Sequence, residues 1–510
     1  MQIRGASYLS HSGAGRPDAA KGREASGMDK FDLAVLGGRV VVPYTGVLHC
    51  DVGIRGGRIA ALADRIRPNH AVEVVDARGK WVFPGAVDSH FHLGIYRSLG
   101  EDAESETRSA LVGGVTSILS YFRTGRHYLN RSGPYREIFP EVLAAVEGKA
   151  YTDYGFHIAI MTEPQLEEVD WLVEFGVTSF KYYMFYKGLN LTADSTRASE
   201  YTMTDTYDLG HLFLLMQRVS EQARRAAERG RISLSLHCEH AELLRVFIEE
   251  VRRAGLSGLE AYHRARPPLS ERLSLAEAVV LADATRCPIN LLHLSSREVM
   301  RAAVEAKRDY PHLDIRLETT VHHLALTFAA ACGIRGKVNP PIRSEDDRAA
   351  LWEAVVSGDV DTVVSDHACC FEEEKGEDLW RALPGFGGTA LLYPYLVSEG
   401  MLQRGLSATR VAELASANSA RAFALYPRKG TVVPGADADL AVVDLEREQE
   451  VHPEVLLSAQ NFTPFQGMRL RGWPVCTIRG GQVVFKEGEI VGKPTGRYLR
   501  RPLRLDERPE

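Results

Sequence analysis

Short apolar runs alternate with amphipathic stretches through the middle of the chain. Longer segments such as residues 140–149, 212–230 and 275–286 repeat their apolar positions with a helical period. Between these segments lie eight short runs with the apolar and β-branched composition of buried strands, at residues 81–90, 115–122, 154–161, 177–184, 232–239, 288–295, 315–321 and 361–366. Eight strands alternating with helices predict an α/β fold, a (β/α)8 TIM barrel. The alternative is a doubly wound open sheet, but no GxGxxG motif follows the first run.

Both ends of the chain have a different pattern, with short strands separated by glycine-rich turns. Such runs occupy residues 33–85 and return at 430–446 and 475–492. We therefore expect both chain ends to build one small β-sandwich beside the barrel. The predicted organisation is a disordered leader at 1–27, with Met28 as a candidate start, an N-terminal sandwich segment at 28–80, the barrel at 81–425, a C-terminal sandwich segment at 426–490 and a C-terminal tail at 491–510.

Composition narrows the classes of protein. The 510 residues are 45% hydrophobic and 25% charged, which is ordinary globular composition. The net charge of −6 provides no positive field, so nucleic acid is not an expected partner. The sequence contains no apolar run of about 20 residues, the length that a membrane-spanning helix needs. The seven cysteines lack CxxC spacing and favour a reducing, cytoplasmic location.

Candidate chemistry lies at the ends of the predicted strands, where barrel enzymes carry their reactive groups. His90 and His92 point to the same side of the first strand, because side chains alternate along a strand, and together can hold one metal ion. Taken alone, the pair is equally compatible with a structural role. Four later strands end in further metal-compatible groups, namely Lys181, His237, His293 and Asp366.

A lysine among metal ligands requires an explanation, since an ammonium group repels divalent cations. Burial favours the neutral amine. A neutral amine can react with carbon dioxide, and the resulting carbamate has two oxygens with which to bridge two metals. The alternative is a barrel lysine paired with a carboxylate such as Asp366.

The chain resembles the amidohydrolase superfamily, in its hydantoinase, dihydropyrimidinase, allantoinase and dihydroorotase branch. The resemblance covers roughly residues 30–500 and rests on motifs that occur in the family's order: PGAVDSHFH, GVTSFKYYMFYKG, LHCE, LLHLSS, ETTVHHL, KVNPPIR, VVSDHA and GADADL. It implies His90, His92, carboxylated Lys181 and Asp366 on a more buried metal, with Lys181, His237 and His293 on an outer one. Zinc is the usual metal, and the ligands also suit manganese, cobalt or iron.

The implied reaction is the opening of a cyclic amide or imide ring by a metal-bridging hydroxide. Two metal ions acting as Lewis acids favour the formation of this hydroxide from water. Asp366 would take the proton of the nucleophile and deliver it to the departing nitrogen. In hydantoinases a tyrosine stands five residues after the bridging lysine, and Tyr186 matches it as a donor to the developing oxyanion. Dihydroorotases have an arginine two residues after the second histidine, where this chain has Gly94. Both observations favour the hydantoinase side, although Tyr186 could instead be a packing residue.

Other matches leave two interpretations open. Asn339 and Gly387 stand where the family contacts the substrate ring, but each also suits a structural turn. His322 and His323 are expected to be structural rather than metal ligands, and His367 to support Asp366. An insertion at 188–210 either reshapes the pocket or is a surface excursion.

Two other functions remain as alternatives. One is an allantoinase-like or dihydroorotase-like ureide hydrolase. The other is a non-catalytic assembly protein like the collapsin response mediators, which is disfavoured because all six ligand positions are present. The resemblance also implies a homotetramer or homodimer, with the tail packing on a neighbouring subunit.

Overall fold

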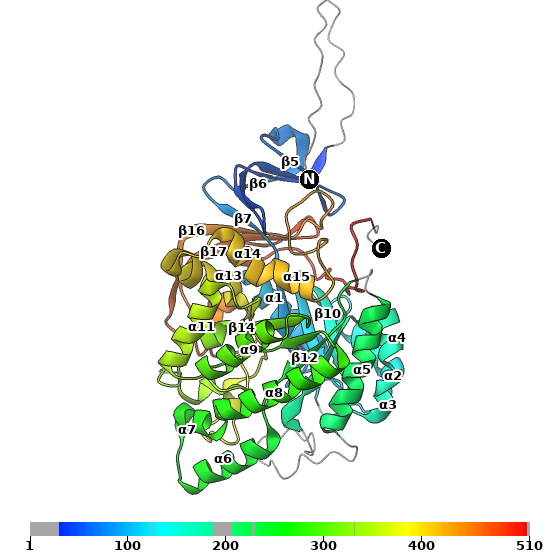
Figure 1. The fold of residues 1–510 in the computed structure, drawn as a ribbon. Helices are drawn as coiled ribbons and strands as arrows, with labels where there is room; N and C mark the ends of the chain where they lie inside the picture. The colour runs from blue at the N-terminus through cyan, green and yellow to red at the C-terminus, as the bar shows by residue number, and fades with distance from the viewer. Residues whose placement is uncertain (1–29, 126, 187–206, 227–229, 331, 507–510) are drawn as a thin grey trace, which may run out of the picture.

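The computed structural model describes residues 30–125, 127–186, 207–226, 230–330 and 332–506. The leader expected at 1–27 and most of the insertion at 188–210 lie outside these residues. Figure 1 shows a helix-covered barrel with a smaller β-structure at one end, formed by blue and orange segments from opposite ends of the chain. No helix among the described residues combines the length and apolar character needed to span a bilayer.

The barrel is an eight-stranded parallel sheet in which each strand pairs with its sequence neighbour. Its strands are β8 (Ala86–Phe91), β9 (Val115–Phe122), β10 (Asp153–Ala159), β11 (Ser179–Tyr183), β12 (Ser233–His237), β13 (Ile289–Leu291), β14 (Ile315–Thr320) and β15 (Thr362–Val364). A parallel bridge from Phe91 to His367, just past β15, brings the last strand back to the first. The predicted barrel is therefore confirmed, and the open doubly wound sheet is wrong.

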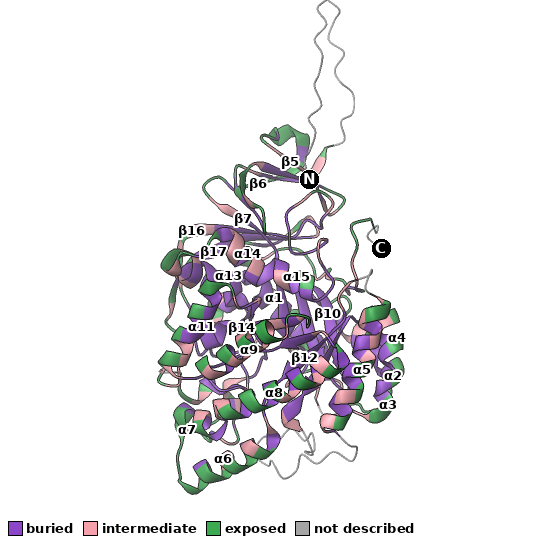
Figure 2. Ribbon diagram, viewed as in Figure 1, coloured by how far each residue is buried: buried purple, intermediate pink, exposed green. Residues whose placement is uncertain are grey.

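Amphipathic helices cover the outside of the barrel, and their buried faces pack on the strands (Figure 2). The main ones are α1 (Leu99–Val112), α2 (Tyr135–Val146), α4 (Val169–Glu174), α5 (Leu209–Arg225), α6 (Ala241–Arg253), α7 (Gly258–Ala265), α8 (Pro268–Thr285), α9 (Arg297–Asp309) and α11 (Glu345–Ser357). Several begin with a serine whose side chain caps the first turn. Ser98 accepts from the N–H of Glu101 and Ser296 from that of Val299.

Two sheets form the β-sandwich. One has the order β5-β4-β1-β6, with β1 (Phe31–Leu36), β4 (Asp51–Arg55), β5 (Arg58–Ala63) and β6 (Ala71–Asp76). The other has the order β19-β18-β17-β16-β7-β2-β3, with β2 (Arg39–Val42), β3 (Gly46–His49), β7 (Trp81–Pro84), β16 (Leu440–Glu450), β17 (Arg469–Arg479), β18 (Gln482–Lys486) and β19 (Glu489–Ile490). Only this second sheet combines both chain ends, and the two sheets share one apolar core.

The run expected as the first barrel strand is divided between two sheets. Its first half, β7, pairs with β16 and β2 in the sandwich, and only β8 enters the barrel. Gly85 separates them, and a Cβ there would lie 2.2 Å from the Thr116 hydroxyl, so only glycine fits this close approach. An apolar run carries no mark of which sheet each half joins, which explains the incorrect prediction.

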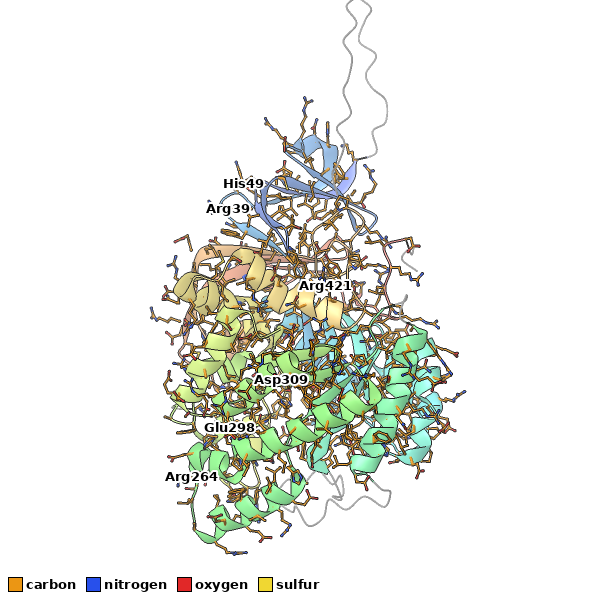
Figure 3. The ribbon with its side chains drawn as sticks, in the orientation of Figure 1. Arg39, His49, Arg264, Glu298, Asp309 and Arg421 are labelled. Carbon is orange, nitrogen blue, oxygen red and sulfur yellow. The ribbon has the colours of Figure 1, made fainter. Side chains whose placement is uncertain are left out.

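A cation–π contact helps to hold the sandwich against the barrel. The guanidinium of Arg421, labelled in Figure 3, lies 4.0 Å from the ring centroid of Tyr44 and 4.6 Å from that of Tyr426. Tyr44 comes from the turn between β2 and β3, and its N–H donates to Glu413. The sandwich is thus anchored by specific contacts and not only by its apolar face.

Candidate metal centre

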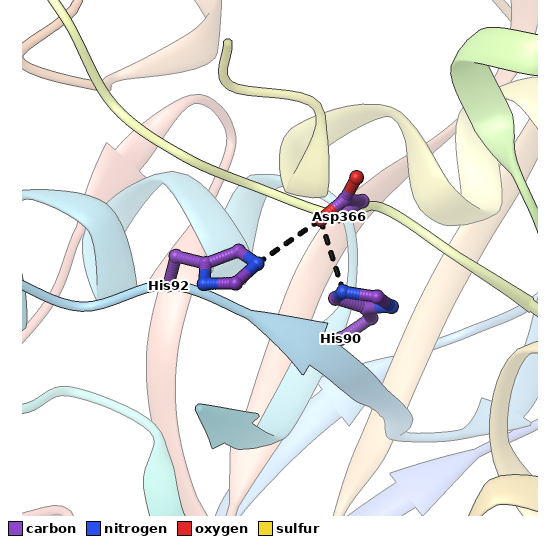
Figure 4. A group of neighbouring side chains, drawn as sticks. All are labelled: His90, His92 and Asp366. Atoms are coloured by element: carbon purple, nitrogen blue, oxygen red, sulfur yellow. Dashed lines mark ion pairs between the residues drawn. The ribbon is translucent and has the colours of Figure 1, made fainter. Parts of the chain in front are cut away.

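Three predicted ligands meet at the carboxyl edge of the barrel. One ligand atom each from His90, His92 and Asp366 lies within 4.8 Å of the others. Oδ1 of Asp366 is 3.1 Å from Nε2 of His90 and 3.2 Å from Nε2 of His92 (Figure 4). The first and last strands of a closed barrel are neighbours, and this closure joins residues separated by more than 270 positions in the sequence.

The two other histidines stand beside this group. The ring centroid of His293 is 5.3 Å from that of His90 and 4.4 Å from that of His237. Nδ1 of His293 is buried and has no hydrogen-bond partner among the described residues. A buried polar atom without a partner is costly, so this nitrogen fits a site completed by a ligand.

Lys181 lies within β11, which pairs with β12, the strand that ends at His237. It is 1% exposed, and its Nζ lies 4.2 Å from the ring centroid of Tyr121 and 4.7 Å from that of Tyr183. Lys181 makes no ion pair in the portion of the chain that the structure describes, so the alternative of a Lys181–Asp366 pair is not supported. Burial lowers the pKa of Lys181 to about 7 despite the opposing effect of Asp366 and Glu318. A large share of this amine is therefore uncharged at neutral pH.

Asp366 has an unusually low pKa and an unusual backbone conformation. Burial favours its neutral form, but His90 and His92 outweigh burial and hold the pKa of Asp366 well below its usual range. Asp366 has φ +51° and His293 has φ +35°, which is the left-handed region that residues other than glycine rarely adopt. Such strain persists where the surrounding structure imposes it, and it is common at active sites.

Carboxylates outside the predicted set orient the histidines. Glu318, within β14, lies 2.7 Å from Nδ1 of His90, and Glu239 lies 2.7 Å from Nε2 of His237. Arg266 in turn donates to Glu239 from its Nε at 2.9 Å. Each carboxylate fixes one ring nitrogen as the donor and leaves the other to face the centre. Sequence reasoning missed Glu318, which lies within a barrel strand two residues before its end, much as Lys181 lies within β11.

His367, the residue after Asp366, contacts the end of the first barrel strand and a buried carboxylate. Its carbonyl oxygen accepts the His92 N–H at 2.9 Å, and its Nε2 lies 2.8 Å from Glu106. Burial opposes ionisation of Glu106, but the bond to His367 contributes most to lowering the pKa of Glu106 to about 2. His367 therefore links the backbone of His92, on the first barrel strand, to the buried carboxylate of Glu106 on α1.

The predicted substrate residues are less closely assembled. Tyr186, half-buried at the end of a short 3-10 helix (Met184–Tyr186), packs 4.9 Å from the Tyr183 ring. The Asn339 Oδ1 accepts from the Tyr262 hydroxyl at 2.6 Å, and the Gly387 N–H donates to Gln460 at 2.9 Å. The N–H of Gly387 is thus engaged within the protein, as its structural interpretation expects.

Among the described residues, neither His322 nor His323 forms an ion pair or a side-chain hydrogen bond with His90, His92 or Asp366. Nδ1 of His323 lies 2.9 Å from the Thr320 hydroxyl, and its Nε2 lies 3.3 Å from the Pro340 carbonyl. Neither histidine belongs to the three-residue ligand group. The contacts of His323 fit the structural role expected of it, whereas Nε2 of His322 is buried and has no hydrogen-bond partner among the described residues.

A parallel barrel with histidines, a buried lysine and an aspartate at its carboxyl edge defines a metal-dependent hydrolase of the amidohydrolase type. The family model described as the amidohydrolase family matches residues 205–484, and the chain belongs to this family.

Among its relatives, the allantoinase of Rubrobacter xylanophilus is 33% identical over 94% of this chain and all of that protein. The D-hydantoinase of Ralstonia pickettii is 28% identical, covering 92% of this chain and 99% of that protein. The solved L-hydantoinase (dihydropyrimidinase) of Arthrobacter aurescens superposes with a TM-score of 0.82 and 26% identity, over 92% of this chain and all of that one. The predicted resemblance is confirmed.

Proposed function

We propose that this protein is a binuclear metal-dependent enzyme that opens a cyclic amide or imide ring of the hydantoin or dihydropyrimidine kind. The observation that carries the proposal is the buried Lys181, which lies on the strand next to the one that ends at His237 and has no ion-pair partner among the described residues. Burial lowers the pKa of this amine to about 7, so the neutral form that reacts with carbon dioxide is accessible near neutral pH. The names of the relatives support the class of substrate.

The residues fit two divalent metals. His90, His92, carboxylated Lys181 and Asp366 would hold the first ion, and Lys181, His237 and His293 the second. The imidazole and oxygen donors suit zinc, and also manganese, cobalt or iron. When bound, such ions supply Lewis acidity and make water nucleophilic near neutral pH.

Asp366 moves the proton in the proposed reaction. Oδ1 faces His90 and His92, while Oδ2 makes no hydrogen bond to the described residues. Oδ2 can therefore take the proton from the attacking water and pass it to the ring nitrogen as the carbon–nitrogen bond breaks. Without this transfer the nitrogen would leave as a strongly basic anion.

Turnover of a ring panel tests the function. Protein loaded with zinc and bicarbonate is assayed with hydantoin, dihydrouracil, allantoin and dihydroorotate, and ring opening is followed by liquid chromatography. We expect at least one ring to be opened, with uptake of one water and formation of one new carboxylate in each opened product. If metal-loaded protein opens none of them, the proposed function is wrong.

An allantoinase-like activity is the second candidate, since relatives named allantoinase reach 33% and 32% identity. A kcat/KM for allantoin above that for hydantoin and dihydrouracil would favour it. The identity of the metal and the cytoplasmic location stay predictions. So does the oligomeric state, a homotetramer or a homodimer, which sedimentation analysis would decide.

Tyr186→Phe should lower kcat by about 100-fold to 1,000-fold with a smaller change in KM. The tyrosine hydroxyl is proposed to donate to the oxygen that gains charge in the transition state, and loss of one such donor has this effect. Tyr182→Phe, in the same aromatic run, is the matched control, because the Tyr182 hydroxyl donates to the Asp208 carbonyl at 2.7 Å, and it should stay near wild-type activity. A Tyr186→Phe enzyme within threefold of wild-type kcat would assign Tyr186 to packing.

Glu239→Gln should weaken metal binding by about 10-fold to 100-fold, because the carboxylate that orients His237 is lost. Metal affinity is measured by competition with a chelator. The control is Glu271→Gln, since Glu271 is likewise buried and paired with an arginine, Arg343, but contacts no predicted ligand. Equal weakening in both variants would reduce the role of Glu239 to general stability.

A further inference from the structure

The C-terminal segment joins the amino-terminal ends of β10 and β11. These two strands pair directly through the last two residues of β10. Their other ends are bridged by residues 497–501: the N–H of Leu499 donates to the Tyr154 carbonyl at 2.7 Å, and that of Arg501 donates to the Gly176 carbonyl at 3.0 Å. In Figure 1 this segment, in red, lies at the end of the barrel nearer the β-sandwich, away from α6 and α7. The segment is therefore part of the barrel wall.

Arg501 carries a positive charge from this segment into the barrel. It is 2% exposed and forms no ion pair within the described residues. Its Nη1 donates to the Ser179 hydroxyl at 2.9 Å, and its Nη2 donates to the carbonyl of Phe156. Burial lowers the pKa of Arg501 to about 10, which still leaves the guanidinium charged at neutral pH. Burying a charge without a carboxylate partner costs stability, so stability alone does not account for an arginine at this position.

A chain of hydrogen bonds runs from Arg501 to the first barrel strand. The Ser179 hydroxyl, which accepts from Arg501, lies 2.5 Å from Nδ1 of His157, and Nε2 of His157 lies 2.9 Å from the Ser89 carbonyl. A carbonyl oxygen can only accept, so Nε2 carries the proton and Nδ1 accepts from the serine hydroxyl. Burial, together with the charge of Arg501, holds the pKa of His157 well below its usual range, in agreement with this neutral form. Each hydrogen bond in the chain therefore has a defined direction.

Both ends of this chain lie next to predicted metal ligands. Ser179 is two residues before Lys181, so the two side chains point to the same face of β11. Ser89 directly precedes His90 on β8. A break in the chain would therefore shift the backbone from which both ligands project.

Stacked aromatic rings form a second connection. The ring of Tyr121, on β9, stacks on that of His157, with the centroids 4.4 Å apart and the planes at 24°. The Tyr121 centroid also lies 4.6 Å from that of His90 and 4.2 Å from Nζ of Lys181. His157 thus supports the aromatic ring that Lys181 and His90 contact.

We propose that Arg501 is a positioning residue of the candidate metal centre. It holds the amino-terminal end of β11 and the ring of His157, and through them it sets the positions of Lys181 and His90. The inference rests on the proposed function, since it concerns how the ligands of that binuclear site are aligned. Residues that orient metal ligands without touching the metal generally contribute about 10-fold to 100-fold to metal affinity.

Zinc binding by Arg501→Met tests the inference. Methionine keeps much of the apolar length of the side chain and removes the charge and both hydrogen bonds. Zinc affinity, measured by competition with a chelator at a temperature where the chain is folded, should fall by about 10-fold to 100-fold. The bicarbonate concentration for half-maximal zinc uptake should rise by about tenfold or more, because a displaced Lys181 forms its carbamate less readily.

Three further variants separate alignment from stability. Ser179→Ala breaks the chain without removing the charge and should show the same losses, and combining it with Arg501→Met should add little, because both residues belong to one network. Arg501→Lys keeps the charge with fewer donors and should fall between wild type and Arg501→Met. Arg500→Met is the matched control: Arg500 is exposed, donates to the Glu174 carbonyl at 2.8 Å, and should leave zinc binding unchanged.

The outcomes distinguish this inference from the proposed function. If Arg501→Met and Ser179→Ala lose thermal stability but keep the wild-type zinc affinity and bicarbonate requirement, the inference is overturned, while ring opening by the wild type upholds the function. If the wild type binds zinc but opens no ring of the panel, the function fails, and the zinc affinities of the variants still decide the inference. If Arg501→Met does not fold, Ser179→Ala decides it. A wild-type chain that binds no zinc would overturn both.

Discussion

Lys181→Ala should lower kcat/KM by about 1,000-fold or more, which corresponds to about 4 kcal/mol of transition-state stabilisation. The substitution removes the buried amine of Lys181, which is proposed to be carboxylated and to hold both metals. Methionine or arginine would not restore activity, because neither can form a carbamate. The measurement is steady-state turnover of the best ring in the panel, with saturating zinc and bicarbonate.

The control for this variant is Lys337→Ala. Lys337 is another buried lysine, and burial lowers its pKa well below the usual range, but its ammonium group donates to the carbonyl of Ala382 away from the candidate centre. Its loss should leave the metal content unchanged. Retention of full activity by Lys181→Ala would show that no bridging lysine is needed.

Asp366→Asn should lower kcat by about 100-fold to 10,000-fold, the range found for loss of a general acid–base group. Asparagine keeps the size of the side chain but cannot accept the proton that Oδ2 is proposed to hold. It also weakens the attraction to His90 and His92, so some loss of metal affinity is expected in addition. Single-turnover kinetics at saturating metal separate the chemical step from metal binding.

Asp153→Asn is the matched control for this substitution. Asp153 is equally buried but stands at the start of β10, where it pairs with Lys429 and Arg479. Breaking this buried network should lower the thermal stability and leave kcat of the folded enzyme near wild type. An Asp366→Asn enzyme that keeps more than a tenth of wild-type kcat would contradict the proton-transfer role.

Periodicity was sufficient to predict the barrel. Each of the eight predicted apolar runs contains a strand of the parallel sheet, because a strand buried on both faces needs a continuous apolar sequence. The same reasoning located the metal-compatible residues, since parallel strands present their carboxyl ends on one face. His90 and Asp366 could be placed together without any knowledge of their distance.

Contacts between side chains from different loops were beyond the sequence pattern. Nothing in LHCE shows that Glu239 pairs with an arginine 27 positions later, and nothing near Tyr128 shows that its hydroxyl will reach His92. These pairs depend on how loops fold over the barrel edge, which is set by tertiary packing. The division of residues 81–91 between two sheets has the same origin, since the composition of neither half identifies the sheet that it joins.

Metal content per chain tests the central claim most directly. Wild-type protein and Lys181→Ala are loaded with zinc and bicarbonate, freed of excess metal by gel filtration and measured by inductively coupled plasma mass spectrometry. A binuclear centre bridged by carboxylated Lys181 predicts two zinc ions per wild-type chain and at most one in the variant. Two ions in Lys181→Ala, or fewer than two in active wild-type protein, would contradict it.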